Sequence, residues 1–271
     1  MYSSMFICPI CKNILNTTGK SLVCENKHCF DISKSGYVNL LTSSAGGRHG
    51  DDKLMVKARS EFLNKDYYKP LANKIVKGIS ALEIENPLII DAGCGEGYYT
   101  QSIENAFNCT LIGIDISKFA LTAAAKRCRN THFAVASTSA MPVQSERADI
   151  VLNIFSPLFA DEFHRVLKDD GYLLRVVPME KHLLELKQAI YDTAYENPAP
   201  DVTLSGFETI KAEPLKYKIH LSDNASINQL FMMTPYYYKT GKDDQMKLEN
   251  MKSIDISAEF CIMLYKKCSR L

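Results

Sequence analysis

The feature that most constrains the fold of this chain is an apolar strand that runs into a glycine-rich turn and then into a helix. It reads Leu88-Ile-Ile-Asp91-Ala-Gly93-Cys-Gly95-Glu-Gly97-Tyr-Tyr-Thr100. Glycines let a backbone come close to a ligand, and a helix N-terminus presents free N–H groups to it. The pattern therefore predicts a nucleotide-bearing ligand at this turn.

The spacing of the glycines narrows the choice of ligand. A nicotinamide-dinucleotide loop has its third glycine three residues after the second, and that position is Tyr98 here. Asp91, just before the turn, is a carboxylate suited to an ammonium group. Asp115, at the tip of the next strand, follows Gly95 by 20 residues and can accept hydrogen bonds from both ribose hydroxyls. The residues thus favour a cofactor that carries an adenosyl group and an amino acid.

The elements that follow indicate the architecture. From Pro87 to Thr193, short apolar and β-branched runs alternate with helical patterns, and two helices precede them. A helix is expected over 181–193, and the alternation of Ile256–Tyr265 suits a closing hairpin at a sheet edge. Such a rhythm implies parallel strands with crossover helices on both faces of the sheet. The predicted body is an α/β sandwich.

A second motif lies near the N-terminus. Cys8-Pro-Ile-Cys11 and Cys24-Glu-Asn-Lys-His28 form two close pairs separated by twelve residues. Zinc takes four tetrahedral nitrogen or sulfur ligands, and a segment this short needs such a staple because it has too little apolar core. Cys29 competes with His28 for the fourth position. A closed site of this kind is structural and is not expected to catalyse.

The composition suits a globular protein of the cytosol. The 271 residues include no apolar run long enough for a membrane span, and the start lacks a basic leader. Nine cysteines, an odd number, argue against a disulfide framework and for metal binding or burial. The polar, glycine-rich stretch 42–52 marks a linker between a zinc-binding segment, 1–41, and a catalytic body, 53–271.

Charge is distributed unevenly along the chain. Residues 1–59 carry eight Lys or Arg and four acids, a balance of +4, so that the total of +1 leaves −3 for the rest. A positive appendage on a mildly acidic body is expected where the appendage meets a polyanion. Small zinc modules are also often rich in lysine for solubility alone. Both interpretations stand on charge alone.

Taken together, a set of motifs along the chain resembles one family, the 23S rRNA guanine-N1 methyltransferases of the RlmA/RrmA type, which includes tylosin-resistance relatives. The motifs are Cys8-x-x-Cys11, Cys24-x-x-x-His28, Phe30-Asp31, Ser35-Gly-Tyr-Val-Asn-Leu-Leu41, Ala58-Arg59, Tyr68-x-Pro70, the glycine turn, Gly113-x-Asp115-x-Ser-Lys118, Ala123-Ala-Ala-Lys-Arg127, Val135-Ala-Ser137, His182-Leu-x-Glu-Leu-Lys187 and Met233-Thr-Pro235. They span nearly the full length.

The resemblance implies a fold, a reaction and partners. The fold is a class I methyltransferase-like (Rossmann-like), mostly parallel seven-stranded sheet with a small N-terminal zinc-binding domain. The reaction is methyl transfer from S-adenosylmethionine to N1 of a guanine in a hairpin loop of 23S rRNA, by an enzyme similar to known homodimers. The linker looks more like that of the tylosin-linked branch, so antibiotic resistance is among the roles that the resemblance allows.

The resemblance also implies site residues. The zinc ligands fall on Cys8, Cys11, Cys24 and His28. The family's cofactor contacts fall on Tyr68, Gly95, Glu96 and His182, and likeness to class I methyltransferases adds Ser137 beside the adenine. With the residues of the turn, the expected cofactor-binding set is Tyr68, Asp91, Gly93, Gly95, Glu96, Gly97, Asp115, Ser137 and His182.

The acceptor base is expected beyond the fourth strand, at Asn153-Ile-Phe-Ser-Pro157. Phe155 could stack on a guanine while Asn153 or Ser156 bonds its edge, and Pro157 closes the loop. An apolar strand end with a proline turn has the same appearance. Guanine N1 carries a proton, so a base or a group that stabilises the O6 anion is wanted. No residue identifies itself as that base.

Two rival functions stay open on the sequence. The first is a methyltransferase of the same fold that acts on a small molecule or a protein, with the zinc segment only stabilising the N-terminus. The second is a zinc-finger RNA-binding factor without catalysis. Activity after removal of the first 40 or so residues would favour the first rival, and absence of S-adenosylmethionine binding would favour the second.

Overall fold

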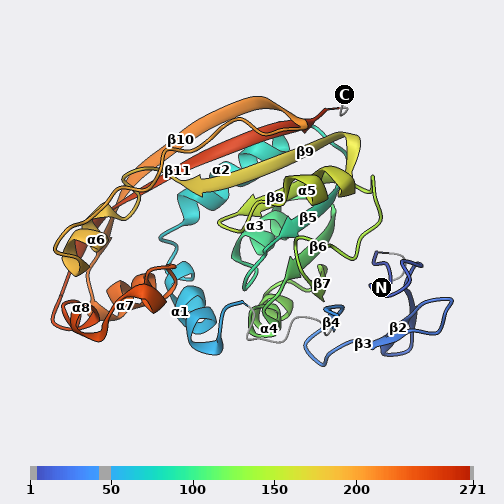
Figure 1. Cartoon of the computed structure of the whole chain (residues 1–271), viewed down its shortest axis with the longest axis horizontal. Coiled ribbons are helices and arrows are strands. Elements are labelled where there is room, and N and C mark those ends of the chain that lie inside the picture. Colours follow the sequence, from blue (N-terminus) through green and yellow to red (C-terminus); the bar gives the residue numbers. More distant parts are fainter. Residues whose placement is uncertain (1–4, 43–49, 269–271) are drawn as a thin grey trace.

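The computed structural model describes residues 5–42 and 50–268, in an eight-stranded sheet with helices on both faces and a small three-stranded sheet at its side (Figure 1). Most of the expected linker, 43–49, lies outside the described residues. The order of the large sheet is β10-β11-β9-β8-β5-β6-β7-β4. Neighbours from β4 to β9 run parallel, whereas β11 is antiparallel to both β9 and β10. The predicted α/β fold is confirmed.

The elements have the following bounds. The strands are β1 (Asn16–Thr18), β2 (Ser21–Val23), β3 (Cys29–Asp31), β4 (Tyr37–Asn39), β5 (Leu88–Ala92), β6 (Thr110–Asp115), β7 (His132–Val135), β8 (Ala148–Ile154), β9 (Leu167–Pro178), β10 (Phe207–Leu221) and β11 (Ile254–Lys267). The helices are α1 (Lys53–Leu63), α2 (Lys69–Ser80), α3 (Tyr98–Ala106), α4 (Lys118–Arg127), α5 (Ala160–Val166), α6 (Leu184–Ile190), α7 (Asn224–Met232), the 3-10 turn η1 (Tyr237–Lys239) and α8 (Lys242–Met246).

Two expectations differ from the structure in detail. The sheet holds the seven predicted strands and an eighth, β4, which comes from the N-terminal extension and pairs with β7. The helix expected over 181–193 is shorter, because Leu183 takes a left-handed conformation (φ 56) and Tyr191 is extended (φ −105, ψ 138). A left-handed residue is incompatible with a continuous right-handed helix, so α6 starts after it.

Alternate strand residues build a core on each face of the sheet. Ile89 of β5 faces a cluster with α2, α3, α6 and α7, whereas its neighbour Ile90 faces a second cluster with α5 and the N-terminal module. This period of two is the ordinary consequence of the strand pleat. The N-terminal module therefore occupies part of one face of the large sheet.

The two ends of the molecule differ in what they carry (Figure 1). The three-stranded sheet of β1, β2 and β3 lies beside β4 and β7, and α6, α7 and α8 lie together at the opposite end. None of the helices in the described ranges combines the length and apolar character that a membrane-crossing helix requires.

Candidate active site and metal centre

The glycine turn after β5 is held in a shape that other residues would not easily take. Gly93, Gly95 and Gly97 all have left-handed backbones, with φ of 91°, 56° and 83°. A Cβ on Gly93 would lie 2.4 Å from Ser156 Cβ, and one on Gly97 would lie 3.1 Å from Ala124 Cβ. Around Gly95 the nearest atom is Arg59 Nη1 at 3.7 Å. Gly93 and Gly97 thus allow close packing against Ser156 and Ala124, and Gly95 leaves space for a ligand.

Asp115 joins the tip of β6 to this turn. Its Oδ2 accepts the backbone N–H of Gly95 at 3.0 Å, and its Oδ1 accepts that of Ser117 at 2.8 Å. Burial raises the pKa of Asp115, and the two backbone donors act against that rise. Each carboxylate oxygen has a second acceptor site, so the side chain can still receive ribose hydroxyls.

Asp91 lies at the end of β5 with 2% of its surface exposed. Thr100 Oγ1 donates to its Oδ2 at 2.6 Å, which fixes the carboxylate toward the first turn of α3. Burial raises the pKa of Asp91 to about 7, although the Thr100 hydrogen bond lowers it. A buried carboxylate of this kind gains most from a cationic partner, which fits the ammonium of an amino-acid-bearing cofactor.

Glu96, in the turn itself, is a buried acid with an unmet hydrogen-bonding atom. It is 2% exposed, and its Oε1 has no hydrogen-bond partner among the described residues. Arg127 Nη2 lies 3.9 Å from that oxygen. Burial raises the pKa of Glu96, while the charges of Arg59 and Arg127 lower it. A buried acceptor without a partner needs an explanation, and a bound ligand supplies one.

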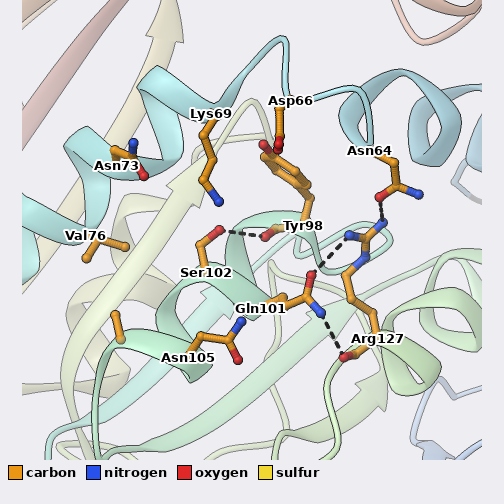
Figure 2. A pocket seen from close by; sticks show the side chains of 11 residues that line it. Asn64, Asp66, Lys69, Asn73, Val76, Tyr98, Gln101, Ser102, Asn105 and Arg127 are labelled. Atoms are coloured by element: carbon orange, nitrogen blue, oxygen red, sulfur yellow. Dashed lines mark hydrogen bonds between the residues drawn. The ribbon is translucent and has the colours of Figure 1, made fainter.

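Arg127 is fixed at the edge of a polar cavity of about 320 Å³ between α2 and α3. Figure 2 shows its guanidinium held by Asn64 Oδ1 at 2.8 Å and Gln101 Oε1 at 3.3 Å, while Gln101 Nε2 donates back to the Arg127 carbonyl. The network leaves the arginine little freedom. It therefore holds a positive charge near Glu96.

Arg59 of α1 had no role assigned to it from the sequence, and the structure places it beside the glycine turn. It forms an ion pair with Asp51, whose carbonyl accepts Ser117 Oγ at 2.6 Å, and it lies closest to the open side of Gly95. The charges of Asp51, Glu96 and Asp115 raise its pKa against burial. Ala58-Arg59 is one of the motifs that carry the family resemblance, but only the contact with the turn indicates what Arg59 does.

Ser137 lies at the start of the loop after β7. Ala136 N donates to the Asp115 carbonyl at 3.1 Å, which brings this loop beside Asp115, the residue expected to bind the ribose. Ser137 Oγ is 2.7 Å from Ser139 Oγ and accepts Ser139 N at 3.2 Å. The expected adenine-side loop thus does lie next to Asp115, and the hydroxyl of Ser137 shapes the loop.

Tyr68 and His182 meet in an aromatic cluster with Phe260 of β11. The rings of Tyr68 and His182 lie 5.2 and 4.7 Å from that of Phe260, measured between centroids. Phe260 was not predicted as a site residue, because in the sequence it is one apolar residue among many in an alternating strand. Both predicted residues are buried, at 2% and 8% exposure.

The hydrogen bonding of His182 defines its chemical state. Its Nδ1 accepts the backbone N–H of Glu259 at 3.2 Å, which leaves Nε2 to carry the proton of the neutral ring. Burial lowers the pKa of His182 to about 3. At neutral pH it is thus an uncharged hydrogen-bond donor, and it does not supply the missing base.

In the loop after β8, where the acceptor base is expected, some residues hold the loop in shape and one is exposed. Asn153 is fully buried, and its Nδ2 donates to Ser156 Oγ at 2.6 Å and to the carbonyls of Ser156 and Pro157 at 3.2 and 3.1 Å. Ser156 Oγ donates to the Ala92 carbonyl at 2.6 Å. These side chains thus hold the loop against the cofactor turn. Asn153 Oδ1 is buried without a partner in the described part of the chain.

Phe155 stands apart from the rest of this loop. It is 44% exposed and has a left-handed backbone (φ 53), which is strained for a residue with a Cβ. Its ring lies 5.4 Å from that of Phe260 and 6.4 Å from that of Tyr99. An exposed aromatic ring held in a strained conformation beside an aromatic cluster is suited to stacking on a base.

The four expected metal ligands come together in the N-terminal module. The ligand atoms of Cys8, Cys11, Cys24 and His28 all lie within 4.8 Å of one another. Cys11 Sγ is 3.6 Å from Cys24 Sγ, and His28 Nδ1 is 3.4 Å from Cys24 Sγ. Tetrahedral zinc–sulfur bonds of about 2.3 Å place ligand sulfurs roughly 3.7 Å apart, so the cluster fits zinc. Exposed Cys29 lies in β3, outside the cluster.

Comparisons with known proteins agree with both halves of this site. The N-terminal zinc-ribbon model described as "RlmA, N-terminal" matches residues 6–44, and a model described as "Methyltransferase domain" matches residues 89–171. Protein YxjB of Bacillus subtilis, whose name places it among 23S rRNA (guanine-N(1)-)-methyltransferases, is 34% identical over 97% of this chain and 98% of its own length.

The chain belongs to the family of 23S rRNA guanine-N1 methyltransferases.

Other relatives extend this result. The 23S rRNA (guanine(748)-N(1))-methyltransferase of Streptomyces fradiae is 27% identical over 94% of this chain and 95% of its own length. Among solved structures, the YcgJ protein of Bacillus subtilis matches with a TM-score of 0.50 and 16% identity over 73% of this chain and 98% of that one. This last likeness supports the fold alone. For this member of the family, the methyltransferase fold and the cofactor S-adenosylmethionine are as the sequence predicted.

Proposed function

We propose that this chain transfers a methyl group from S-adenosylmethionine to N1 of a guanine in a hairpin loop of 23S rRNA. The observation that carries the proposal is the presence of the zinc cluster and of the turn with Asp91 and Asp115 in one chain, which the Bacillus subtilis relative matches over 97% of its length. We propose the division into a zinc-binding segment, 1–41, a linker, 42–52, and a methyltransferase domain, 53–271.

The residues around the turn would hold the cofactor. Asp91 pairs with its ammonium, Asp115 accepts the ribose hydroxyls, and the open side of Gly95 admits the backbone of the ligand. The expected contacts Tyr68, Glu96, Ser137 and His182 complete the set. The sulfonium supplies an activated methyl group, so the main tasks of the protein are to align donor and acceptor and to exclude water.

The acceptor guanine is proposed to stack on Phe155, beside the cluster of Tyr68, His182 and Phe260. Asn153, Ser156 and Pro157 hold the loop that presents this ring. His182, a neutral donor, suits an oxygen whose negative charge grows as N1 loses its proton. This use of His182 would add to its contact with the cofactor.

The zinc module is proposed to contact the RNA. Lys12 and Lys27 are exposed, have left-handed backbones (φ 64 and 63), and adjoin the ligands Cys11 and His28. The two knuckles thus present positive charge at the rigid, metal-held end of the module, where phosphates can be bound. The closed ligand set makes this metal structural.

The deciding experiment is mass spectrometry of large-subunit rRNA from cells with the gene, without it, and with an Asp91→Asn copy. We expect a methylguanine only with the intact gene, and position 748 is the first to examine, because it is the nucleotide in the name of the Streptomyces fradiae relative. Unchanged rRNA in all three strains would contradict the proposal. Methylation of a small molecule or protein instead would establish the first rival function.

Three further properties are proposed from the family resemblance alone. The enzyme is proposed to be cytosolic and homodimeric, which cell fractionation and analytical ultracentrifugation test. A role in antibiotic resistance is tested by growing the same three strains in tylosin. Equal growth of all three would contradict that role and leave the methylation proposal intact.

A further inference from the structure

The N-terminal module is built into the wall of the cofactor site. Strand β4 pairs in parallel with β7, placing Tyr37 opposite Phe133 and Asn39 opposite Val135. Leu40 N also donates to the Val135 carbonyl at 2.9 Å. Since β7 runs directly into the loop that begins at Ser137, the extension fixes the strand from which the adenine-side loop departs.

The segment of the module that precedes β1 contacts that loop itself. Ile7 N donates to the Pro142 carbonyl at 2.9 Å. Apolar side chains of the module and of the loop also form part of one buried cluster. Its members include Phe6, Leu15 and Leu22 from the module and Ala136, Met141 and Val143 from the loop. The loop is therefore packed between the module and the sheet.

A third contact reaches the glycine turn. Tyr37 and Leu41 pack against a cluster that contains Phe133 and Cys94, the residue between the first two glycines of the turn. A Cβ on Gly113 would lie 2.4 Å from Phe133 Cε1 and 3.1 Å from Cys94 Sγ. Gly113, Phe133 and Cys94 are closely packed, so a shift of β4 that moves Phe133 also displaces Cys94.

The metal ligands belong to the same packed unit. Cys8 and Cys24 are 0% and 4% exposed and lie in the cluster that includes Met141 and Val143. The module is too small to hold its shape without a staple. We propose that the metal-held module positions the adenine side of the cofactor pocket, so that metal binding and cofactor binding are energetically coupled. The inference rests on the proposed use of S-adenosylmethionine.

The coupling is tested by cofactor affinity in the full-length protein without RNA. Titration calorimetry compares S-adenosylhomocysteine with methylthioadenosine, which keeps the adenosine but lacks the amino acid. Wild type is measured with zinc, after chelation, and after zinc is restored, and Cys24→Ser is compared with Cys29→Ser. Cys29 is the matched control, because it is exposed and outside the cluster. Leu41→Ala, which keeps all four metal ligands, tests the packing without metal loss.

We expect chelation and Cys24→Ser to weaken both ligands by the same factor, about tenfold, within the range usual for coupled sites. Restored zinc should recover the affinity, Cys29→Ser should leave it unchanged, and Leu41→Ala should weaken both ligands with zinc retained. Equal affinity with and without metal, or loss confined to S-adenosylhomocysteine, would overturn the coupling alone. If Cys24→Ser fails to fold, reversible chelation and Leu41→Ala decide. Absence of binding by the intact zinc protein would instead overturn the proposed function.

Discussion

The metal centre and the aromatic cluster proposed to receive the acceptor base are assembled in opposite ways. The metal ligands lie within residues 8–28, and each pair belongs to one tight knuckle. The residues of this proposed acceptor site come from four distant segments, Tyr68 before α2, Phe155 after β8, His182 after β9 and Phe260 in β11. The first site depends on local turns and the second on the register of the whole sheet.

The difference teaches where each site is vulnerable. A local site fails when one ligand is lost, because the small sheet of β1, β2 and β3 has little apolar core of its own. A site distributed over the sheet stays folded when a single residue is substituted, but its function depends on the few groups that contact the substrate. The cofactor turn lies between these extremes, since its glycines are local but Ser156 and Asp115 hold it from other strands.

The largest effect is expected at the metal centre. In Cys11→Ser the protein should lose the roughly one zinc per chain that elemental analysis finds in wild type, because structural zinc contributes on the order of 10 kcal/mol to the folding of such modules. Hydrogen exchange should show β1, β2 and β3 unprotected. Cys29→Ser should keep its zinc. Full metal content in Cys11→Ser would contradict the ligand set.

The next largest effect is expected at Asp91. Asp91→Asn keeps the shape of the side chain and its place beside Thr100 but removes the charge that faces the ammonium. Binding of S-adenosylmethionine should weaken by about 3 kcal/mol, roughly a hundredfold, while methylthioadenosine binding stays unchanged. Asp170→Asn, at an exposed carboxylate, is the control. An equal loss for both ligands would show that Asp91 supports the turn and does not contact the amino acid.

A smaller effect is expected in the proposed acceptor site. Phe155→Ala and Phe155→Gly should each lower kcat/KM for the RNA about tenfold, the effect of losing one stacked base, with cofactor affinity unchanged. Glycine adopts φ 53 freely, so the free energy of unfolding measured with urea should be about 1 kcal/mol higher for Phe155→Gly than for Phe155→Ala. Phe159→Ala, another exposed aromatic nearby, is the control. Normal RNA kinetics in both Phe155 variants would remove the stacking role.

The same contrast, between sites built from local turns and sites built from distant segments, determines what the sequence could predict. The strand–turn–helix, the acids at the strand tips and the spaced cysteines follow from local geometry, and the structure has the turn, the mostly parallel sheet and the metal cluster as expected. The places of Arg59 beside the turn and of Phe260 in the aromatic cluster were not predicted, because they arise only from contacts across the fold. For Asn153 the sequence left open a contact with the base or a purely structural turn, and the structure shows its amide group donating within its own loop, through a turn geometry that no spacing reveals.

The packing of the N-terminal module was also beyond the sequence. A glycine-rich stretch indicates a boundary between segments, but it carries no information on whether the segments share a core. Here Phe6 and Met141 lie in one buried cluster, and β4 extends the large sheet. Three-residue strands such as β4 are too short to show alternation, so its pairing with β7 leaves no trace in the hydrophobic pattern.

The smallest expected effect is a pH dependence of the affinity for S-adenosylmethionine, which arises from Asp91. The contribution of the metal centre to that affinity should not share this pH dependence. Burial raises the pKa of Asp91 to about 7, so in the free enzyme the carboxyl is mostly neutral at pH 6 and mostly ionised at pH 7.5. Only the ionised form attracts the ammonium, so the affinity for S-adenosylmethionine should rise with pH, roughly eightfold over that interval for one group of this pKa. Binding should also release protons, which appear as a calorimetric heat that depends on the buffer.

Two comparisons sharpen this last expectation. Asp91→Asn should bind weakly with no such pH dependence, and methylthioadenosine, which lacks the ammonium, should bind wild type equally at both pH values. A constant affinity for S-adenosylmethionine would mean that Asp91 does not change its ionisation between pH 6 and 7.5. If Asp91 were ionised throughout, the Thr100 hydrogen bond, which lowers its pKa, would outweigh burial. Asp91 and Thr100 would then act as one unit, set by the local contact between β5 and α3 and not by the wider fold.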